Sequence, residues 1–268
     1  MPYLEDVAGV RTHYLDQGHG APVVVLHGGL ESARDWQFLA DALSEHHRVL
    51  RPERRGHGGT ADVDGDYTYE LMADETVAFI EIAVGEPSHL IGYSDGATTA
   101  MFVALDRPDL VQSLTLISGH FHHDAILGLM ADRLAHPEPD NPRLASIREA
   151  YGAASPDGPE HWPTFHRKVS RLGATQPSGD VRALASIPRP TLIIAADDDV
   201  VDLHHIVDQF GSIPDARLAI IPGTSHLLHH EVPDIIAALA RRFLDPDEPA
   251  RLMPVRSRRQ DPPPLDAS

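Results

Sequence analysis

The chain has 268 residues, of which 42% are hydrophobic, which is enough for one large α/β domain with a substantial core. Its 40 acidic and 22 basic residues give a formal charge of −18, which argues against nucleic acid as a partner, because phosphate binding depends on clustered Lys and Arg. No apolar run approaches the ~20 residues of a membrane-spanning helix, and there is no cysteine for a disulfide, a thiolate metal site or a nucleophile. We therefore expect a globular protein that acts on a small molecule, with no membrane partner. The first ten residues do not read as a secretory signal, so the cytoplasm is the expected compartment.

Apolar, β-branched segments alternate with helical patterns along most of the chain. Strands are expected at 23–26, 48–51, 88–93, 114–117, 191–195 and 217–221, and helices at 36–43, 69–84, 97–105 and 233–243. This alternation predicts a mostly parallel sheet covered by helices on both faces.

The strand pattern disappears between residues 120 and 187. Helical stretches at 125–134 and 143–151 stand there between several prolines, so we expect a helical lid inserted into a core made of 1–119 and 188–244. Residues 245–268 are rich in proline and charge, and we expect an irregular tail.

Residues 92–96 read GYSDG and match the pattern GxSxG. In that pattern the serine lies on a tight turn between a strand and a helix, and the two glycines relieve the crowding around it. Because an apolar strand precedes Ser94 and a helical pattern follows it, the context favours Ser94 as a catalytic nucleophile.

A serine hydroxyl needs a base to remove its proton and an acid to orient that base. Asp199 follows the strand at 191–195, and His226 follows the strand at 217–221. The carboxyl ends of parallel strands meet at one edge of a sheet, so the three side chains are expected together, in the chain order Ser, Asp, His.

Other residues near these positions remain alternatives. Asp197 and Asp198 adjoin Asp199, and Asp124 follows the preceding strand. His229 and His230 are close to His226, but they lie beyond the loop and are expected to face elsewhere.

The chain from about Val10 to Leu244 resembles the α/β-hydrolase superfamily on these motifs. Residues 27–29, HGG, resemble the family's oxyanion loop, and residues 53–58, ERRGHG, resemble its D-x-R-G-x-G stretch with Glu53 in place of Asp, a departure that concerns packing. The resemblance implies an α/β-hydrolase fold with Ser94, Asp199 and His226 as the triad, and neither a cofactor nor a metal.

The oxyanion hole needs two donors directed at the developing negative charge. We expect the backbone amides of Asp95, at the positive end of the following helix, and of Gly29, with Leu30 as the alternative to Gly29. His27 is expected to brace this loop rather than to transfer protons.

The carboxylate of Asp95 has two interpretations. In family members that resemble valacyclovir hydrolase, an aspartate after the nucleophile recognises the α-amino group of amino-acid esters. The alternative is that Asp95 only stabilises the start of the helix. His120, at the start of the lid, is a candidate substrate contact, and apolar lid residues are candidates for the pocket or for the lid's own core: Phe121, Leu127, Leu129, Met130, Trp162 and Phe165.

The chain contains 18 histidines, several in adjacent pairs at 122–123, 204–205 and 229–230. Neighbours in sequence point apart on a helix or strand, so we interpret these pairs mostly as surface residues and predict no metal site.

The predicted function is hydrolysis of a small-molecule carboxylic ester through an acyl-enzyme intermediate. Relatives with the same triad open lactones or hydrolyse carbon-carbon bonds, so a lactonase or a carbon-carbon bond hydrolase is the alternative. Haloalkane dehalogenase and epoxide hydrolase are disfavoured, because those relatives carry a nucleophilic aspartate where this chain has Ser94. A non-catalytic ligand receptor or interaction module on the same fold is the alternative from another class, and the sequence leaves the oligomeric state open.

Overall fold

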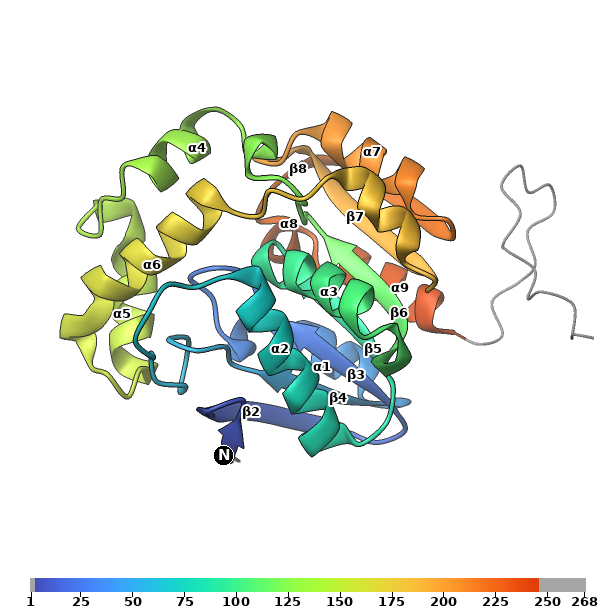
Figure 1. The fold of residues 1–268 in the computed structure, drawn as a ribbon, viewed down its shortest axis with the longest axis horizontal. Helices are drawn as coiled ribbons and strands as arrows, with labels where there is room; N and C mark the ends of the chain where they lie inside the picture. Colours follow the sequence, from blue (N-terminus) through green and yellow to red (C-terminus); the bar gives the residue numbers. More distant parts are fainter. Residues whose placement is uncertain (1–2, 246–268) are drawn as a thin grey trace, which may run out of the picture.

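A computed structural model describes residues 3–245 of the chain. An eight-stranded sheet runs through the molecule in the order β1-β2-β4-β3-β5-β6-β7-β8 (Figure 1). Its strands are β1 (Tyr3–Val7), β2 (Val10–Gly18), β3 (Ala21–Leu26), β4 (His47–Pro52), β5 (Ser88–Tyr93), β6 (Val111–Ile117), β7 (Thr191–Asp198) and β8 (Ala216–Ser225). From β4 to β8 all neighbouring strands are parallel, whereas β1 and β2 are antiparallel to their neighbours.

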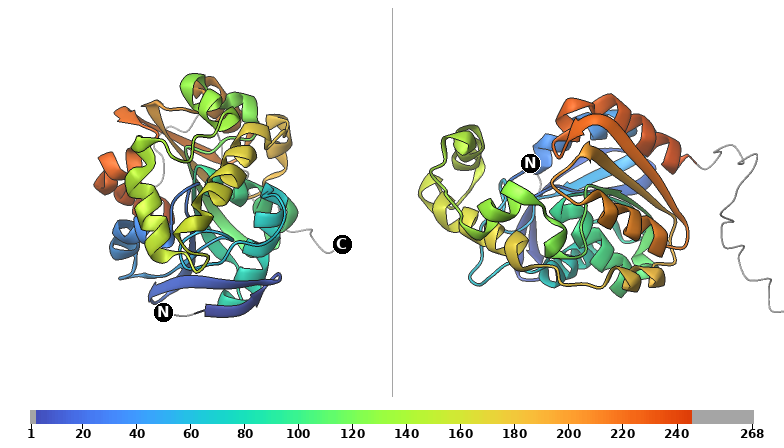
Figure 2. Two further views of the ribbon diagram at one scale, coloured as in Figure 1. Left: turned by 90° about the vertical axis from the view of Figure 1, so that its left-hand side faces the viewer. Right: turned by 90° about the horizontal axis from the view of Figure 1, so that it is seen from above.

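Helices cover both faces of the sheet, as the sequence predicts (Figures 1 and 2). Helices α2 (Tyr69–Phe79), α3 (Asp95–Asp106) and α7 (Leu203–Ser212) pack on one face around buried residues such as Leu90 and Leu116. Helices α1 (Gln37–Leu43), α8 (Leu228–Glu231) and α9 (Pro233–Leu244) pack on the other, around Val25 and Ile91. Because alternate side chains of a strand point to opposite faces, each central strand contributes to both cores.

All six predicted strands are confirmed, but β1 and β2 were not predicted. Both strands are rich in polar residues, so they lack the apolar run that reveals a central strand. They are held in the sheet by backbone pairing, β2 with β4 and β1 with β2.

Helix α4 (Gly128–Ala135) begins later than the predicted range of 125–134. A short 3₁₀ turn (His123–Ala125) precedes it, and Gly128, the first residue of the helix, has a φ of +53°. The glycine tolerates this left-handed angle and lets the chain change direction there.

The segment between β6 and β7 contains α4, α5 (Ala145–Ala154) and α6 (Trp162–Thr175), which lie together beyond the edge of the sheet where the strands end (Figure 1). Trp162, Phe165 and Leu172 of α6 pack with Tyr69 and Met72 of α2 in a separate apolar cluster. Helix α6 was not predicted, because Pro163 is one of the prolines of this segment that were expected to interrupt helices. The proline lies in the first turn of α6, where its missing N–H costs no hydrogen bond.

In residues 3–245, no helix combines the length and the apolar character needed to cross a membrane. Apart from Asp245, the predicted irregular tail lies outside the described residues.

Candidate active site

Ser94 lies on the sharp turn between β5 and α3 that its sequence context predicts. Its backbone angles are φ 50° and ψ −117°, a strained combination for a residue with a side chain. A Cβ on Gly92 would lie 2.3 Å from the carbonyl oxygen of Gly96, and one on Gly96 would lie 2.1 Å from that of Leu26. Both positions therefore require glycine, and the turn holds the Ser94 side chain at the carboxyl edge of the sheet.

Three side chains from three strand ends form one hydrogen-bonded chain. His226 Nε2 lies 3.1 Å from Ser94 Oγ, and His226 Nδ1 lies 2.7 Å from Asp199 Oδ1. When Nδ1 donates its proton to the carboxylate, Nε2 is left as an acceptor for the serine hydroxyl. The arrangement can therefore remove a proton from Ser94, which is the role the sequence analysis gave to His226.

Of the three adjacent aspartates, the structure brings only Asp199 to His226. Asp197 is exposed and accepts hydrogen bonds from the amides of Gly223 and Thr224, while Asp198 is exposed. Asp199 is almost fully buried and accepts a second hydrogen bond, of 2.5 Å, from the Ser118 hydroxyl.

The pKa of Asp199 reflects these contacts. Burial alone would raise the pKa of Asp199, but the hydrogen bonds from His226 and Ser118, together with the attraction of His226, hold it below the ordinary value. The carboxylate therefore remains ionised beside the imidazole.

The predicted oxyanion loop, residues 27–30, lies beside Ser94. The backbone amides of Gly29 and Asp95 have no acceptor within residues 3–245, and both residues line the cavity at Ser94. Leu30, the alternative to Gly29, also lines the cavity and has a φ of +60°. The two amides are therefore free to bind an anionic oxygen.

Two charged side chains fix this loop. Arg54 is buried, and its Nη2 donates to the carbonyls of His27 and Gly28 at 2.7 and 2.8 Å. Glu31 accepts the amide of Gly28 at 2.9 Å and the indole N–H of Trp36 at 3.2 Å. Because the carbonyls of His27 and Gly28 are bound to Arg54, they are not directed at the cavity. The amide of Gly29, the next residue, is left available for an oxyanion.

His27 is fully buried beneath the loop. Its Nε2 accepts the amide of Arg54 at 3.3 Å, and burial, with the neighbouring Arg54 and His57, holds the pKa of His27 well below its ordinary value. It is therefore neutral and supports the loop, in agreement with the bracing role expected from the sequence.

Two further buried histidines line the cavity. Burial lowers the pKa of His57 to about 3 and that of His120 to about 4. Each is neutral at physiological pH, and the Nε2 of each has no hydrogen-bond partner in the described part of the chain. The Nε2 atom of His120 is itself buried, so the predicted contact of His120 with the substrate stays a prediction.

The Asp95 side chain does not cap its own helix. Its Oδ1 accepts a hydrogen bond of 2.7 Å from the Tyr69 hydroxyl, and a Cβ on Gly29 would lie 2.5 Å from its Oδ2. The carboxylate is therefore packed between α2 and the oxyanion loop, at the wall of the cavity.

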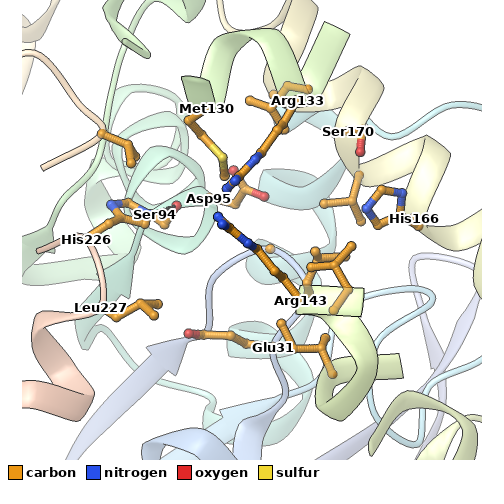
Figure 3. A pocket seen from close by; sticks show the side chains of 18 of the residues that line it. Glu31, Ser94, Asp95, Met130, Arg133, Arg143, His166, Ser170, His226 and Leu227 are labelled. Carbon is orange, nitrogen blue, oxygen red and sulfur yellow. Dashed lines mark hydrogen bonds between the residues drawn. The ribbon is translucent and has the colours of Figure 1, made fainter. Parts of the chain in front are cut away.

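A cavity of about 950 Å³ opens over Ser94 and His226. The core contributes Leu30, Tyr93 and Val201 to its lining, and the 120–187 segment contributes Leu129, Met130 and Phe165. Figure 3 shows Met130 of α4 close to Ser94, and His166 and Ser170 of α6 at the far side of the same cavity. Of the apolar residues considered from the sequence, Trp162 and Phe121 belong to packed cores and Leu127 is exposed.

The family model for the alpha/beta hydrolase family matches residues 23–239. The chain belongs to this family. The hydrolase is 27% identical to the 2-hydroxy-6-oxo-6-(2'-aminophenyl)hexa-2,4-dienoic acid hydrolase of Metapseudomonas resinovorans, with 89% of each chain covered. Among solved structures it is similar to a meta-cleavage product hydrolase from Pseudomonas fluorescens IP01 (TM-score 0.74, 25% identity, 88% and 95% covered). The fold is also that of an enol-lactonase from Burkholderia xenovorans LB400 (TM-score 0.74, 19% identity, 91% and 99% covered).

The paired histidines of the hydrolase were predicted to lie mostly on the surface, and His229 is the one of the six that is buried. His229 is fully buried, stacks on Trp36 at 5.1 Å, and its Nε2 lies 2.9 Å from Glu31 Oε1. Its neighbour His230 is exposed, and donor atoms of Glu31, His229 and His230 lie within 4.8 Å of one another. Glu31 is already engaged by the amide of Gly28 and by Trp36, so this cluster is better explained as support for the loop than as a metal site.

Three supporting contacts were missed by the sequence analysis: those of Glu31, Ser118 and Tyr93. The Tyr93 hydroxyl donates to the backbone carbonyl of His226 at 2.8 Å. Glu31 and Ser118 directly follow a predicted motif and a predicted strand, and Tyr93 lies within the GYSDG motif. This position is the signal by which sequence reasoning could have found them.

Proposed function

We propose that this hydrolase cleaves a small-molecule carboxylic ester through an acyl-enzyme intermediate, with Ser94, His226 and Asp199 as its catalytic triad. The observation that carries the proposal is the continuous hydrogen-bonded chain from Ser94 Oγ through His226 to Asp199, with distances of 3.1 and 2.7 Å. The free amides of Gly29 and Asp95 at the same cavity support it, because acyl transfer passes through an oxyanion.

In the first step, His226 Nε2 takes the proton of Ser94 as Oγ attacks the ester carbonyl. The amides of Gly29 and Asp95 bind the resulting oxyanion. The imidazolium, stabilised by Asp199, gives its proton to the departing alkoxide, and an alcohol leaves. Water then adds to the acyl-enzyme with His226 as base, and the tetrahedral intermediate collapses to release the acid and regenerate Ser94.

The helical segment 120–187 is proposed to act as a lid over this reaction. Residues from α4, α5 and α6 line the same cavity as Ser94, so an opening motion of the segment would control both entry of substrate and exclusion of water.

The test is to treat the purified protein with p-nitrophenyl acetate and with a fluorophosphonate probe that labels activated serines. We expect labelling of the wild type, no labelling of Ser94→Ala, and loss of activity by about six orders of magnitude in His226→Ala. A wild type that is not labelled would instead favour a ligand receptor or interaction module.

A lactonase or a carbon-carbon bond hydrolase is the second candidate. It is favoured by the relative named as a hexadienoic acid hydrolase and by the structural similarity to a meta-cleavage product hydrolase. Turnover of esters, lactones and vinylogous diketones by the wild type and Ser94→Ala distinguishes these reactions.

Recognition of an amino group by Asp95 is a hypothesis about the same pocket. It is motivated by the carboxylate at the cavity wall, and the measurement is the ratio of amino-ester to plain-ester turnover. If Asp95→Ala leaves that ratio unchanged, the hypothesis is wrong.

A further inference from the structure

Two arginines of the 120–187 segment reach into the cavity above Ser94. Arg133 lies in the last turn of α4, and Arg143 lies in a short 3₁₀ turn (Pro142–Leu144) before α5. Both line the cavity, and Figure 3 shows the two side chains pointing from separate elements toward the same space beside Asp95 and Ser94.

Neither guanidinium has a hydrogen bond or an ion pair within residues 3–245, although acidic residues lie close in sequence. Those acids have other partners: Asp132 pairs with His136 at 3.2 Å, Glu138 accepts from Asn141 at 3.1 Å, and Asp140 pairs with Arg148 at 3.1 Å. Local charge pairing therefore does not account for the direction of either arginine.

The position of Arg133 has a partial explanation in helix stability, since a cation in the last turn of a helix is favourable. Arg143 has no such role, because it belongs to a turn rather than to a helix end. Two like charges directed at one space repel each other, and the repulsion is relieved when an anion lies between them.

The rest of the cavity indicates the kind of anion. Guanidinium groups bind planar carboxylates with two parallel hydrogen bonds. Five acidic residues also line the cavity: Glu31, Asp35, Asp95, Asp132 and Glu138. Their field disfavours a doubly charged phosphate more than a singly charged carboxylate. Apolar side chains, including Leu134, Ile147 and Val169, line it as well, and they suit a hydrocarbon chain between the anion and the reacting carbonyl.

We infer that Arg133 and Arg143 form a carboxylate clamp and that the substrates are acyl compounds carrying a second, free carboxylate. The inference rests on the proposed function for its reacting group, but the clamp itself concerns binding. The clamp and the recognition of an amino group by Asp95 predict opposite preferences. An enzyme that selects an ammonium group through Asp95 would reject substrates that carry a free carboxylate.

The kinetic test compares three p-nitrophenyl esters that differ mainly in terminal charge: mono-p-nitrophenyl adipate, its methyl ester and the ε-aminocaproate. In the wild type we expect kcat/KM for the anionic ester to exceed that for the methyl ester by at least about tenfold. Arg133→Gln and Arg143→Gln should each lower this ratio about tenfold, chiefly through KM. Arg171→Gln is the matched control, because Arg171 lies in α6, is exposed and pairs with Asp66; it should keep the wild-type ratio.

A binding measurement separates failure of the clamp from failure of the proposed chemistry. Monomethyl adipate is titrated calorimetrically into Ser94→Ala with and without Arg143→Gln, and we expect affinity to fall about tenfold in the double variant. Equal affinities, an unchanged ester ratio in both arginine variants, or a preference of the wild type for the ε-aminocaproate would each overturn the clamp. Absence of fluorophosphonate labelling would overturn the proposed hydrolysis, while the titration would still decide the clamp.

Discussion

The hydroxyl of Tyr93 donates a hydrogen bond of 2.8 Å to the backbone carbonyl of His226, so the residue before the nucleophile holds the loop that carries the base. Tyr93 is buried, and its ring lies 5.2 Å from that of His226. This hydrogen bond joins the two strand ends that carry Ser94 and His226, next to the atoms that are proposed to react.

We expect Tyr93→Phe to remove this bond and leave the partly buried carbonyl of His226 without its partner. The free energy of unfolding should fall by about 1–2 kcal/mol, and kcat for p-nitrophenyl acetate should fall roughly tenfold, because Ser94 and His226 lose their alignment. Urea denaturation and steady-state kinetics measure the two effects. Tyr14→Phe is the control, since the Tyr14 hydroxyl has no hydrogen bond in the described residues; equal behaviour of the two variants would refute the role of Tyr93.

Asp199→Asn should lower kcat by about four orders of magnitude, because a neutral amide neither selects the tautomer of His226 nor stabilises the imidazolium. The measurement is hydrolysis of p-nitrophenyl acetate by protein of verified fold. Asp198→Asn provides a control of equal charge change, as Asp198 is exposed. Comparable loss in both variants would mean that the triad acid has been misassigned.

The lowered pKa of Asp199 also predicts a pH dependence of stability. A carboxyl whose pKa is lower in the folded than in the unfolded state stabilises the fold above the unfolded value of ~3.9, and this contribution is lost as the pH falls through the folded value. The difference in unfolding free energy between the wild type and Asp199→Asn should therefore narrow as the pH falls from about 5 to about 3. Urea titrations across this range would detect it, and a difference that widened on acidification would contradict the assignment.

Glu31 supports the oxyanion loop through Gly28 and is itself held by Trp36 and His229. We expect Glu31→Gln to lower kcat about tenfold with little change in KM, because the loop acts on the transition state more than on bound substrate. Glu45→Gln is the control, because Glu45 is exposed and lies just after the C-terminal end of α1. A change confined to KM would place Glu31 in substrate binding instead.

The close packing of backbone atoms around Gly92 and Gly96, in the turn at Ser94, predicts that a larger residue there destabilises the fold. Gly96→Ala places a methyl group against the carbonyl of Leu26, so we expect a loss of at least about 2 kcal/mol of stability and little soluble protein. Gly211→Ala in α7 is the matched control, because a Cβ there meets nothing within 4 Å and the backbone is helical. It should raise stability by about 0.5–1 kcal/mol, which thermal denaturation can resolve.

The sequence by itself determined six of the eight strands and the chain positions of Ser94, His226 and the group of three aspartates that contains Asp199. These follow from local rules, because apolar runs of strand length must be buried and residues after parallel strands meet at one edge. Helix α6 was missed because a proline is taken as a helix breaker unless its place in the helix is known. Strands β1 and β2 were missed because they lack a long apolar run.

Only the tertiary structure decided which of three adjacent aspartates contacts His226, since the choice depends on where the chain leaves β7 and not on residue type. It also decided that His229 is buried under Trp36, and that Arg133 and Arg143 face the cavity. Each of these features depends on how segments that are far apart in the chain pack against one another. The residues around each position contain no local signal of that packing.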